Sequence, residues 1–317
     1  MMAATILLAL TPIFFVMALG YGAGRWGIVD NHHVDGLNVL VMNFALPASL
    51  FAATASASRS EMYAQAPLFV ILSGVMLVVF LGWYCFQVRI RKTGKPDSSL
   101  QALTIAFPNL AGVGLPILAD VIGPAGTIPL AVALAAGSII ISPLALVLVE
   151  LNVKKDGADP SAGRSKIFSA LRHALTKPVV LAPALGIVFS LSGLPTGKVL
   201  DASLLLIGHA APGVALFLTG VVLSAQAFRL NWKVVNATIV ADLVRPLLTA
   251  AIVLPLGVAP DTAKVAILLA AVPSGFFGIL FAVNYRLDSA TTGSMVIAST
   301  ISSIVTLAVA IALLYPH

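Results

Sequence analysis

The amino-acid sequence predicts an all-α integral membrane protein with ten transmembrane helices in two inverted five-helix repeats. Three observations lead to this fold class. First, 59% of the 317 residues are hydrophobic and only 9% are charged, with a mean hydropathy of +1.04. Second, ten apolar stretches approach the ~20 residues that cross a bilayer. Third, the two halves of the chain repeat one pattern of prolines and glycines. The high hydrophobic and low charged content excludes a soluble domain. It also excludes a nucleic-acid-binding protein, despite a net charge of +6.

The ten predicted helices follow one another through short polar loops. We expect the first to be a retained span, because Met1–Gly20 lacks the basic start and cleavage site of a secretory signal. The longest polar interval, 151–165, is interpreted as a cytoplasmic linker between a first repeat (1–150) and a second repeat (166–317). The predicted spans are 2–24, 34–55, 67–88, 99–120, 125–149, 168–192, 199–225, 233–255, 263–283 and 289–315.

Matching residues recur between the halves at a nearly constant spacing, which indicates a duplication. Because each half has five spans, an odd number, the two copies would have opposite orientations in the membrane. The matches at a spacing of 166 are Pro12 with Pro178, Ala18-Leu19-Gly20 with Ala184-Leu185-Gly186, and Asp35 with Asp201; those at 165 are Pro47 with Pro212 and Pro108 with Pro273.

The loop charges predict which ends face the cytoplasm. With both termini outside, fourteen Lys and Arg residues lie in cytoplasmic loops, whereas the outer loops hold only Arg59, Lys198 and Lys264. Such a positive-inside bias favours this orientation in the inner (plasma) membrane and supports the span count. The cytoplasmic residues are Arg25, Arg89, Arg91, Lys92, Lys95, Lys154, Lys155, Arg164, Lys166, Arg172, Lys177, Arg229, Lys233 and Arg286.

Prolines and glycines interrupt two of the predicted spans. The fourth contains Pro108-Asn109-Leu110-Ala111-Gly112-Val113-Gly114-Leu115-Pro116, and the ninth contains Pro273-Ser274-Gly275-Phe276-Phe277-Gly278. Proline removes a backbone donor and glycine frees the backbone, so a continuous helix is disfavoured there. We expect both helices to be unwound, at Pro108–Gly114 and Pro273–Gly278, and to cross near mid-membrane. Paired broken helices in two repeats mark the substrate site of a secondary transporter.

These two broken segments, with the continuation Phe281-Ala282-Val283-Asn284-Tyr285, resemble the auxin efflux carrier family, whose bacterial members include proteins described as malonate carriers. The resemblance covers the whole chain. It implies two inverted five-helix repeats, crossing helices four and nine, a scaffold part beside a moving part, and organic anions, above all carboxylates, as substrates. The chain lacks the long central hydrophilic loop of the plant members. In architecture alone it also resembles, more distantly, the sodium-coupled bile acid symporters.

The residues at the breaks are the candidate substrate ligands. At each break, the half-helix that follows the proline begins with unpaired N–H groups and a partial positive charge, which favour a carboxylate. Asn109 and Ser274 could add hydrogen bonds to the substrate, or could only satisfy the broken backbone. The other candidates are Pro108, Gly112, Gly114, Pro273, Gly275 and Asn43, the last of which lies four residues before Pro47.

Three further polar residues lie inside predicted spans. Asp242 and Arg245, spaced i, i+3, are expected on one helix face, where they could pair. Arg245 could hold a substrate carboxylate and Asp242 a coupling proton, or the pair could only anchor helix packing. His209 could serve a proton step, although a lone buried histidine is more often simply hydrogen-bonded.

The sequence therefore favours a secondary transporter that moves a small organic anion by alternating access. A sodium-coupled symporter is the main alternative, and a channel is a weaker one. The sequence contains neither a convergent nucleophile and base nor a Walker loop, so we expect no enzyme. The single Cys85 and the lack of a zinc motif predict no metal or cofactor beyond a coupling ion, H⁺ or Na⁺. The expected partners are the anion and the lipid bilayer, with a homodimer as one option.

Overall fold

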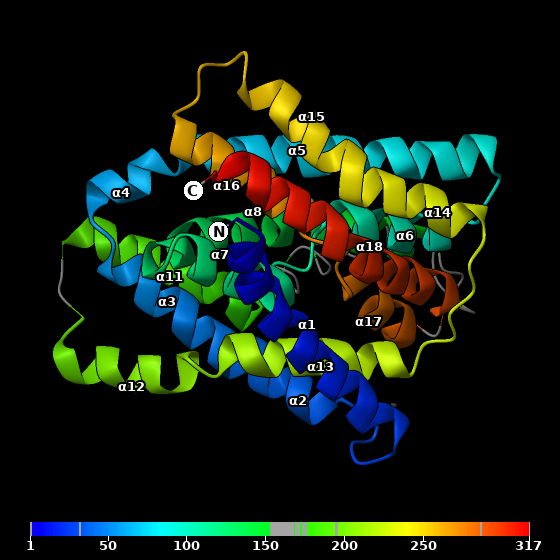
Figure 1. Ribbon diagram of the computed structural model, residues 1–317, viewed down its shortest axis with the longest axis horizontal. Coiled ribbons are helices and arrows are strands. Elements are labelled where there is room, and N and C mark those ends of the chain that lie inside the picture. The colour runs from blue at the N-terminus through cyan, green and yellow to red at the C-terminus, as the bar shows by residue number, and fades with distance from the viewer. Residues whose placement is uncertain are drawn as a thin grey trace.

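The computed structural model describes residues 2–31, 33–152, 168, 172, 176–193, 196–285 and 287–316, and every regular element among them is a helix (Figure 1). Most of the predicted linker, 153–165, lies outside the described residues, and Leu151 and Asn152 belong to the preceding helix. The fold is therefore all-α, as predicted, within the described part of the chain.

Several helices contain π-helical turns (η1, η2, η3, η5 and η7) or a 3₁₀ turn (η4). The first half consists of α1 (Met2–Arg25), α2 (Asp35–Val39), η1 (Leu40–Ala45), α3 (Leu46–Ser56), α4 (Arg59–Ala64), α5 (Ala66–Cys85), η2 (Phe86–Ile90), α6 (Lys95–Ala106), η3 (Leu110–Gly114), α7 (Leu115–Val121), η4 (Pro124–Gly126), α8 (Thr127–Ala136), η5 (Gly137–Ile141) and α9 (Ser142–Asn152). The second half consists of α11 (Pro178–Ser192), α12 (Lys198–Gly208), α13 (Ala211–Ser224), α14 (Trp232–Ile239), η7 (Val240–Val244), α15 (Arg245–Val253), α16 (Pro260–Ala271), α17 (Phe277–Asn284) and α18 (Ala290–Leu314).

Six segments of the described chain are long and apolar enough to cross a membrane. The predicted first, fourth, sixth and ninth spans are not among them. The fourth and ninth are missing because α6, α7, α16 and α17 are each only 7 to 12 residues long. The count of ten spans stays a prediction. The six segments are Asp35–Ser56, Arg59–Ile90, Pro124–Asn152, Lys198–Ser224, Trp232–Val253 and Ala290–Leu314.

Two helix pairs join the predicted repeats through glycines. Helix α1 packs along α13, and α11 packs along α3 (Figure 1). A Cβ atom on Gly20 would lie 2.0 Å from the Phe217 carbonyl oxygen, and one on Gly186 would lie 2.0 Å from Thr54 Oγ1. Only glycine permits so close an approach, which is typical of helix packing in membranes. The repeated glycines thus serve corresponding helix contacts.

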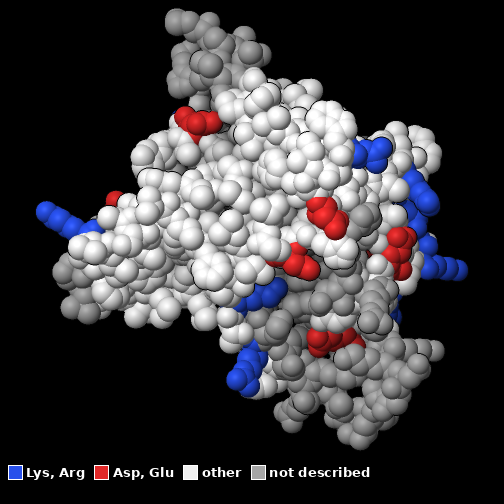
Figure 2. Space-filling view, turned by 90° about the horizontal axis from the view of Figure 1, so that it is seen from below, with Lys and Arg blue, Asp and Glu red and all other residues white. Residues whose placement is uncertain are grey.

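Charged side chains concentrate at the ends of the helices. The turns from α5 to α6 and from α13 to α14 lie at the right-hand end of Figure 1, whereas α4, the end of α11 and the start of α12 lie at the left. In Figure 2, Lys and Arg side chains lie towards the right-hand edge, below the centre and at the left edge, and a broad part of the left half between them has no charged side chain. An uncharged surface between charged ends is the pattern of a chain that faces lipid.

Helices α6 and α16 both stop at a break. Helix α6 ends at Ala106 and the chain becomes helical again at Leu110; α16 ends at Ala271 and helix resumes at Phe277. Both breaks are shorter than expected, because Gly112 and Gly114 lie in the π-helical turn η3 and Gly278 lies in α17. The Asn109 carbonyl accepts from the N–H groups of both Val113 and Gly114, which widens this turn.

Candidate functional site

The two breaks lie against each other, and we call the contact region the crossover site (Pro108, Asn109, Pro273, Ser274 and Gly275). Pro108 and Ser274 form an isolated antiparallel β-bridge, and Asn109 N donates to the Pro273 carbonyl at 2.8 Å. Residue 275 must be a glycine in this packing, because a Cβ atom on Gly275 would lie 2.3 Å from the Phe107 carbonyl oxygen. The predicted meeting of the two breaks is therefore present in the fold, while its depth in a bilayer stays a prediction.

Asn109 caps the helix that follows the first break. Its Oδ1 accepts from Gly112 N at 3.0 Å, and its Nδ2 lies 3.4 Å from Thr219 Oγ1 of α13. Only 3% of the residue is exposed. Asn109 therefore has the capping role that the sequence offered as one alternative. Because the contact to Thr219 is long, the Asn109 amide N–H groups can still donate to a ligand.

The sequence analysis missed Thr219. Its Oγ1 donates to the Ala215 carbonyl at 2.8 Å, as Thr54 Oγ1 donates to the Leu50 carbonyl at 2.7 Å. Thr54 and Thr219 are 165 residues apart, the spacing of the matching prolines. The recurrence of threonine at the repeat spacing was therefore a signal in the sequence for Thr219.

Ser274 has an unused hydroxyl inside the crossover site. Its N–H donates to Ser299 Oγ of α18 at 2.8 Å, which satisfies the broken backbone. Its own Oγ is buried and has no hydrogen-bond partner in the described part of the chain. A buried hydroxyl left in this way is costly unless a ligand or water completes it.

Asp242 is connected to the crossover site through Ser299. The Ser299 hydroxyl donates to Asp242 Oδ1 at 2.6 Å while it accepts from Ser274 N. Asp242 is 2% exposed, and its Oδ2 has no hydrogen bond of its own among the described residues, although the Ser302 hydroxyl faces the carboxylate. One hydroxyl therefore separates a buried carboxylate from the backbone of the second break.

Arg245 does not form the expected ion pair with Asp242 in the described structure. Its Nε donates to the Ala270 carbonyl at 2.8 Å, and its two Nη atoms donate to the carbonyls of Ile105 and Val272. The prediction was wrong because Asp242 lies in the π-helical turn η7, which ends immediately before Arg245 and changes the angular offset that i, i+3 spacing gives in an α-helix. The guanidinium instead binds the C-terminal ends of α6 and α16, where a cation complements the helix dipoles.

Two other candidates lie away from the crossover site. His209 follows α12 and is exposed, so the expectation of a buried histidine was wrong. The α12 helix ends there, immediately before α13 begins at Ala211. Asn43 is also exposed, in η1, with no hydrogen-bond partner in the described part of the chain. Neither residue contributes a described hydrogen bond to the crossover site.

Aromatic rings pack beside the crossover site. The rings of Phe107 and Phe277 are 5.1 Å apart, and those of Phe276 and Phe277 are 5.6 Å apart. Beyond the end of α17, the Tyr285 hydroxyl donates to Glu150 Oε1 at 2.6 Å. Burial, together with this hydrogen bond, raises the pKa of Tyr285 above its ordinary value, so the phenol stays protonated. These contacts tie both sides of the second break to the first half of the chain.

No group of three or more His, Cys, Asp or Glu residues that could hold a metal ion occurs in the part of the chain that the structure describes. The groups that can act chemically at the crossover site are therefore an amide, hydroxyls, backbone donors and the nearby carboxylate. They suit hydrogen bonding to a ligand and the binding of a proton.

Comparisons with known proteins give whole-chain matches. Residues 5–311 match a family model described as "Membrane transport protein". "Uncharacterized transporter YfdV" of Escherichia coli K12 is 28% identical over 94% of this chain and 94% of its own length. An "Uncharacterized transporter" of Methanothermobacter thermautotrophicus is 26% identical over 93% of this chain and 94% of its own length. "Auxin efflux carrier component 3a" of Oryza sativa is 30% identical over 38% of this chain and 20% of its own length.

Proposed function

Because the chain belongs to the membrane transport protein family of the auxin efflux carriers, we propose that it is a secondary carrier of a small organic anion, bound at the crossover site. The observation that carries this proposal is the contact between the two helix breaks, where Asn109 and Ser274 are buried together. The unpartnered Ser274 hydroxyl and the donor capacity of the Asn109 amide suit a carboxylate acceptor.

Electrostatics favour an anion over a cation at this site. The helix segments that begin at Leu110 and Phe277 both start at the crossover site, so their positive dipole ends point towards it. Pro108, Pro273 and Gly275 contribute by exposing backbone groups, whereas Gly112 and Gly114 shape the first turn of η3. The substrate we propose is a small carboxylate of the malonate type.

We propose that the ten spans form two inverted five-helix repeats that surround this site. The α1–α13 and α3–α11 pairs support this arrangement. At the repeat spacing α1 corresponds to α11 and α3 corresponds to α13, so the two pairs are equivalent contacts between the repeats. Thr54 and Thr219 add corresponding hydrogen bonds at the repeat spacing. One part of the repeat would rock against the other and expose the site to each side in turn.

The orientation we propose has both termini outside in the inner membrane. The exposed basic residues of the α5–α6 and α13–α14 turns, including Arg91, Lys92 and Arg229, support a cytoplasmic right-hand end in Figure 1. The end that carries Arg59 and Lys198 would then be the outer end.

For coupling, we propose that Asp242 binds and releases a proton. Its Oδ2 atom is buried with no hydrogen bond of its own, so it can hold the proton, and Ser299 connects the carboxylate to Ser274 N. Arg245 and the hydroxyls of Ser299 and Ser302 are the charged and polar groups that face it. Neutralising Asp242 would change the electrostatic field at the crossover site and thereby link proton binding to substrate binding.

Counterflow in proteoliposomes tests the carrier function. Purified protein is reconstituted, loaded with unlabelled malonate, and assayed for uptake of labelled malonate and of a panel of other dicarboxylates. A carrier gives saturable uptake that internal substrate accelerates. Flux that rises linearly with concentration and ignores internal substrate would instead identify a channel. Replacing Na⁺ by choline distinguishes the sodium-coupled alternative, which alone would lose uptake.

A further inference from the structure

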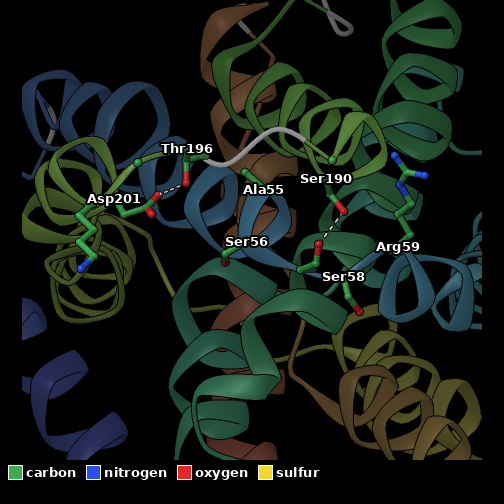
Figure 3. A pocket seen from close by; sticks show the side chains of 11 residues that line it. Ala55, Ser56, Ser58, Arg59, Ser190, Thr196 and Asp201 are labelled. Atoms are coloured by element: carbon green, nitrogen blue, oxygen red, sulfur yellow. Dashed lines mark hydrogen bonds between the residues drawn. The ribbon is translucent and has the colours of Figure 1, made fainter.

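A pocket at the end of the molecule opposite the basic turns is not used by the proposed carrier mechanism. It has a volume of about 530 Å³ and lies between the end of α3, the start of α4, the end of α11 and the start of α12 (Figure 3). We call it the end pocket. Its polar lining residues are Ser56, Ser58, Arg59, Ser190, Thr196, Lys198 and Asp201.

Positive charge dominates the end pocket. Two cations, Arg59 and Lys198, and one carboxylate, Asp201, line it. The Asp201 carboxylate already accepts from Thr196 Oγ1 at 2.5 Å, and Figure 3 places Asp201 and Arg59 on opposite sides of the pocket. Neither cation has an ion-pair partner in the described part of the chain. Among the residues that the structure describes, no carboxylate therefore pairs with the Arg59 guanidinium.

The backbone around the end pocket makes room for the guanidinium. Gly193 has a φ of +75°, and a Cβ atom there would lie 3.0 Å from Arg59 Nη2. On the same side of the pocket as Arg59, the Ser190 hydroxyl donates to the Ala57 carbonyl at 2.6 Å and joins the end of α11 to the end of α3. Ser58 N donates to Glu61 Oε2 at 2.6 Å, and Glu61 forms no ion pair with Arg59 in the described part of the chain. The walls are thus fixed by contacts that leave Arg59 available.

The position of these cations on the chain is unusual. Arg59 and Lys198 are two of the three basic residues predicted in outer loops, and the topology brings both to one pocket although 139 positions separate them. The third, Lys264, lies instead over the Tyr315 ring, 5.6 Å from its centroid. Two of the three basic residues predicted in outer loops, Arg59 and Lys198, therefore line the same cavity.

We propose that the end pocket is a binding site for a small oxyanion, a carboxylate or a phosphate group, with Arg59 as its principal ligand. Guanidinium binds such groups through paired N–H donors, and Lys198 adds a second positive charge. The oxyanion is either a free solute or the headgroup of an anionic lipid, since both present the same chemistry at a membrane surface. This binding does not depend on the crossover site or on transport.

The single cysteine of the chain allows a local test. In a Cys85→Ser background, Ser56→Cys places one thiol on the pocket wall, and its reaction rates with an anionic and a cationic methanethiosulfonate reagent are compared after division by each reagent's rate with free 2-mercaptoethanol. We expect the anionic reagent to be favoured about threefold or more at low salt, and the preference to fade in 1 M salt. Millimolar malonate or inorganic phosphate should slow the labelling.

Matched variants decide the outcome. Arg59→Gln should abolish both the charge preference and the protection, Lys198→Gln should weaken them, and Lys264→Gln should change neither. Protection by soluble phosphate or malonate in neutral detergent identifies a free anion. Protection only in vesicles that contain phosphatidylglycerol, compared with phosphatidylcholine alone, identifies a lipid headgroup. Equal normalised rates for the two reagents, or protection that survives Arg59→Gln, would overturn the proposal.

Discussion

The Arg245 guanidinium donates to the main-chain carbonyl of Val272, the residue immediately before the proline of the second break. The same side chain reaches Ile105, one turn before the first break. One fully buried cation therefore holds the ends of two half-helices that come from opposite halves of the chain. If the crossover site moves during transport, α6, α15 and α16 would move as one body.

Replacing Arg245 should destabilise the protein strongly. Arg245→Met leaves three buried carbonyls without donors and Asp242 without a nearby positive charge, which should cost about 3–5 kcal/mol. Arg245→Lys keeps the charge but cannot reach three carbonyls, so an intermediate loss is expected. Thermal unfolding in detergent measures both. In an Asp242→Asn background the cost of Arg245→Met should shrink, and an unchanged cost would argue that the cation does not compensate the carboxylate.

Gly275→Ala should disrupt the crossover site, because the added methyl group would lie 2.3 Å from the Phe107 carbonyl oxygen. Such overpacking against backbone typically costs about 1–3 kcal/mol, or more where the chain cannot shift. Gly213→Ala is the matched control, since a Cβ there meets no atom within 4 Å. Unfolding midpoints and malonate counterflow should both fall for Gly275→Ala alone; two equally active variants would contradict the packing described.

Variants of Asn109 separate substrate contact from capping. If the amide binds a carboxylate, Asn109→Ala should weaken anion binding by about tenfold to hundredfold, equivalent to roughly 1.5–3 kcal/mol. Asn109→Asp retains an oxygen that can accept from Gly112 N, yet it places a negative charge against the anion, so its binding should be weaker still.

A binding titration with malonate ranks these variants, and Thr219→Val serves as the control. That substitution removes the hydroxyl 3.4 Å from Asn109 Nδ2 without changing the amide itself. The contrary outcome is that Asn109→Asp binds malonate with an affinity close to that of the wild type, while Asn109→Ala only lowers the stability of the protein. In that case Asn109 has the capping role alone.

Asp242→Asn should uncouple transport from the proton gradient. The amide keeps the shape and can still accept from Ser299, but it cannot bind and release a proton. Accumulation of labelled malonate driven by a pH gradient should therefore be lost, whereas counterflow without a gradient should persist. His209→Gln is the control, because the exposed His209 side chain should leave both activities unchanged. If the Asp242→Asn variant still accumulates malonate when driven by a pH gradient, Asp242 is not the proton-binding group in coupling.

The sequence predicted the helical class and the two breaks because proline and glycine act through their own backbones. A residue such as Pro108 disrupts a helix wherever it lies, so its effect is visible without knowing its neighbours. Asn109 could likewise be placed directly after a break, and its capping bond with Gly112 is local in the chain.

The partners of Arg245, Asp242 and Ser274 could not be predicted, because all of them lie on other helices. The π-helical turn that contains Asp242 and precedes Arg245 has no strong residue signature, so the angle between their side chains was misjudged. His209 was expected to be buried from its place in an apolar stretch, but an apolar environment in a membrane protein includes the lipid-facing surface. Which side of a helix faces lipid depends on packing that only the structure supplies.

The pairing of α1 with α13 also sets an order of events during biogenesis. About 190 residues separate Arg25 from Ala211, so the first helix emerges long before its packing partner exists. At ordinary rates of synthesis the delay is roughly 10–40 s. During that interval the Gly20 surface faces lipid or another inserted helix. The contact between α1 and α13 can therefore form only after about two-thirds of the chain has been translated, later than the contact between α1 and α7.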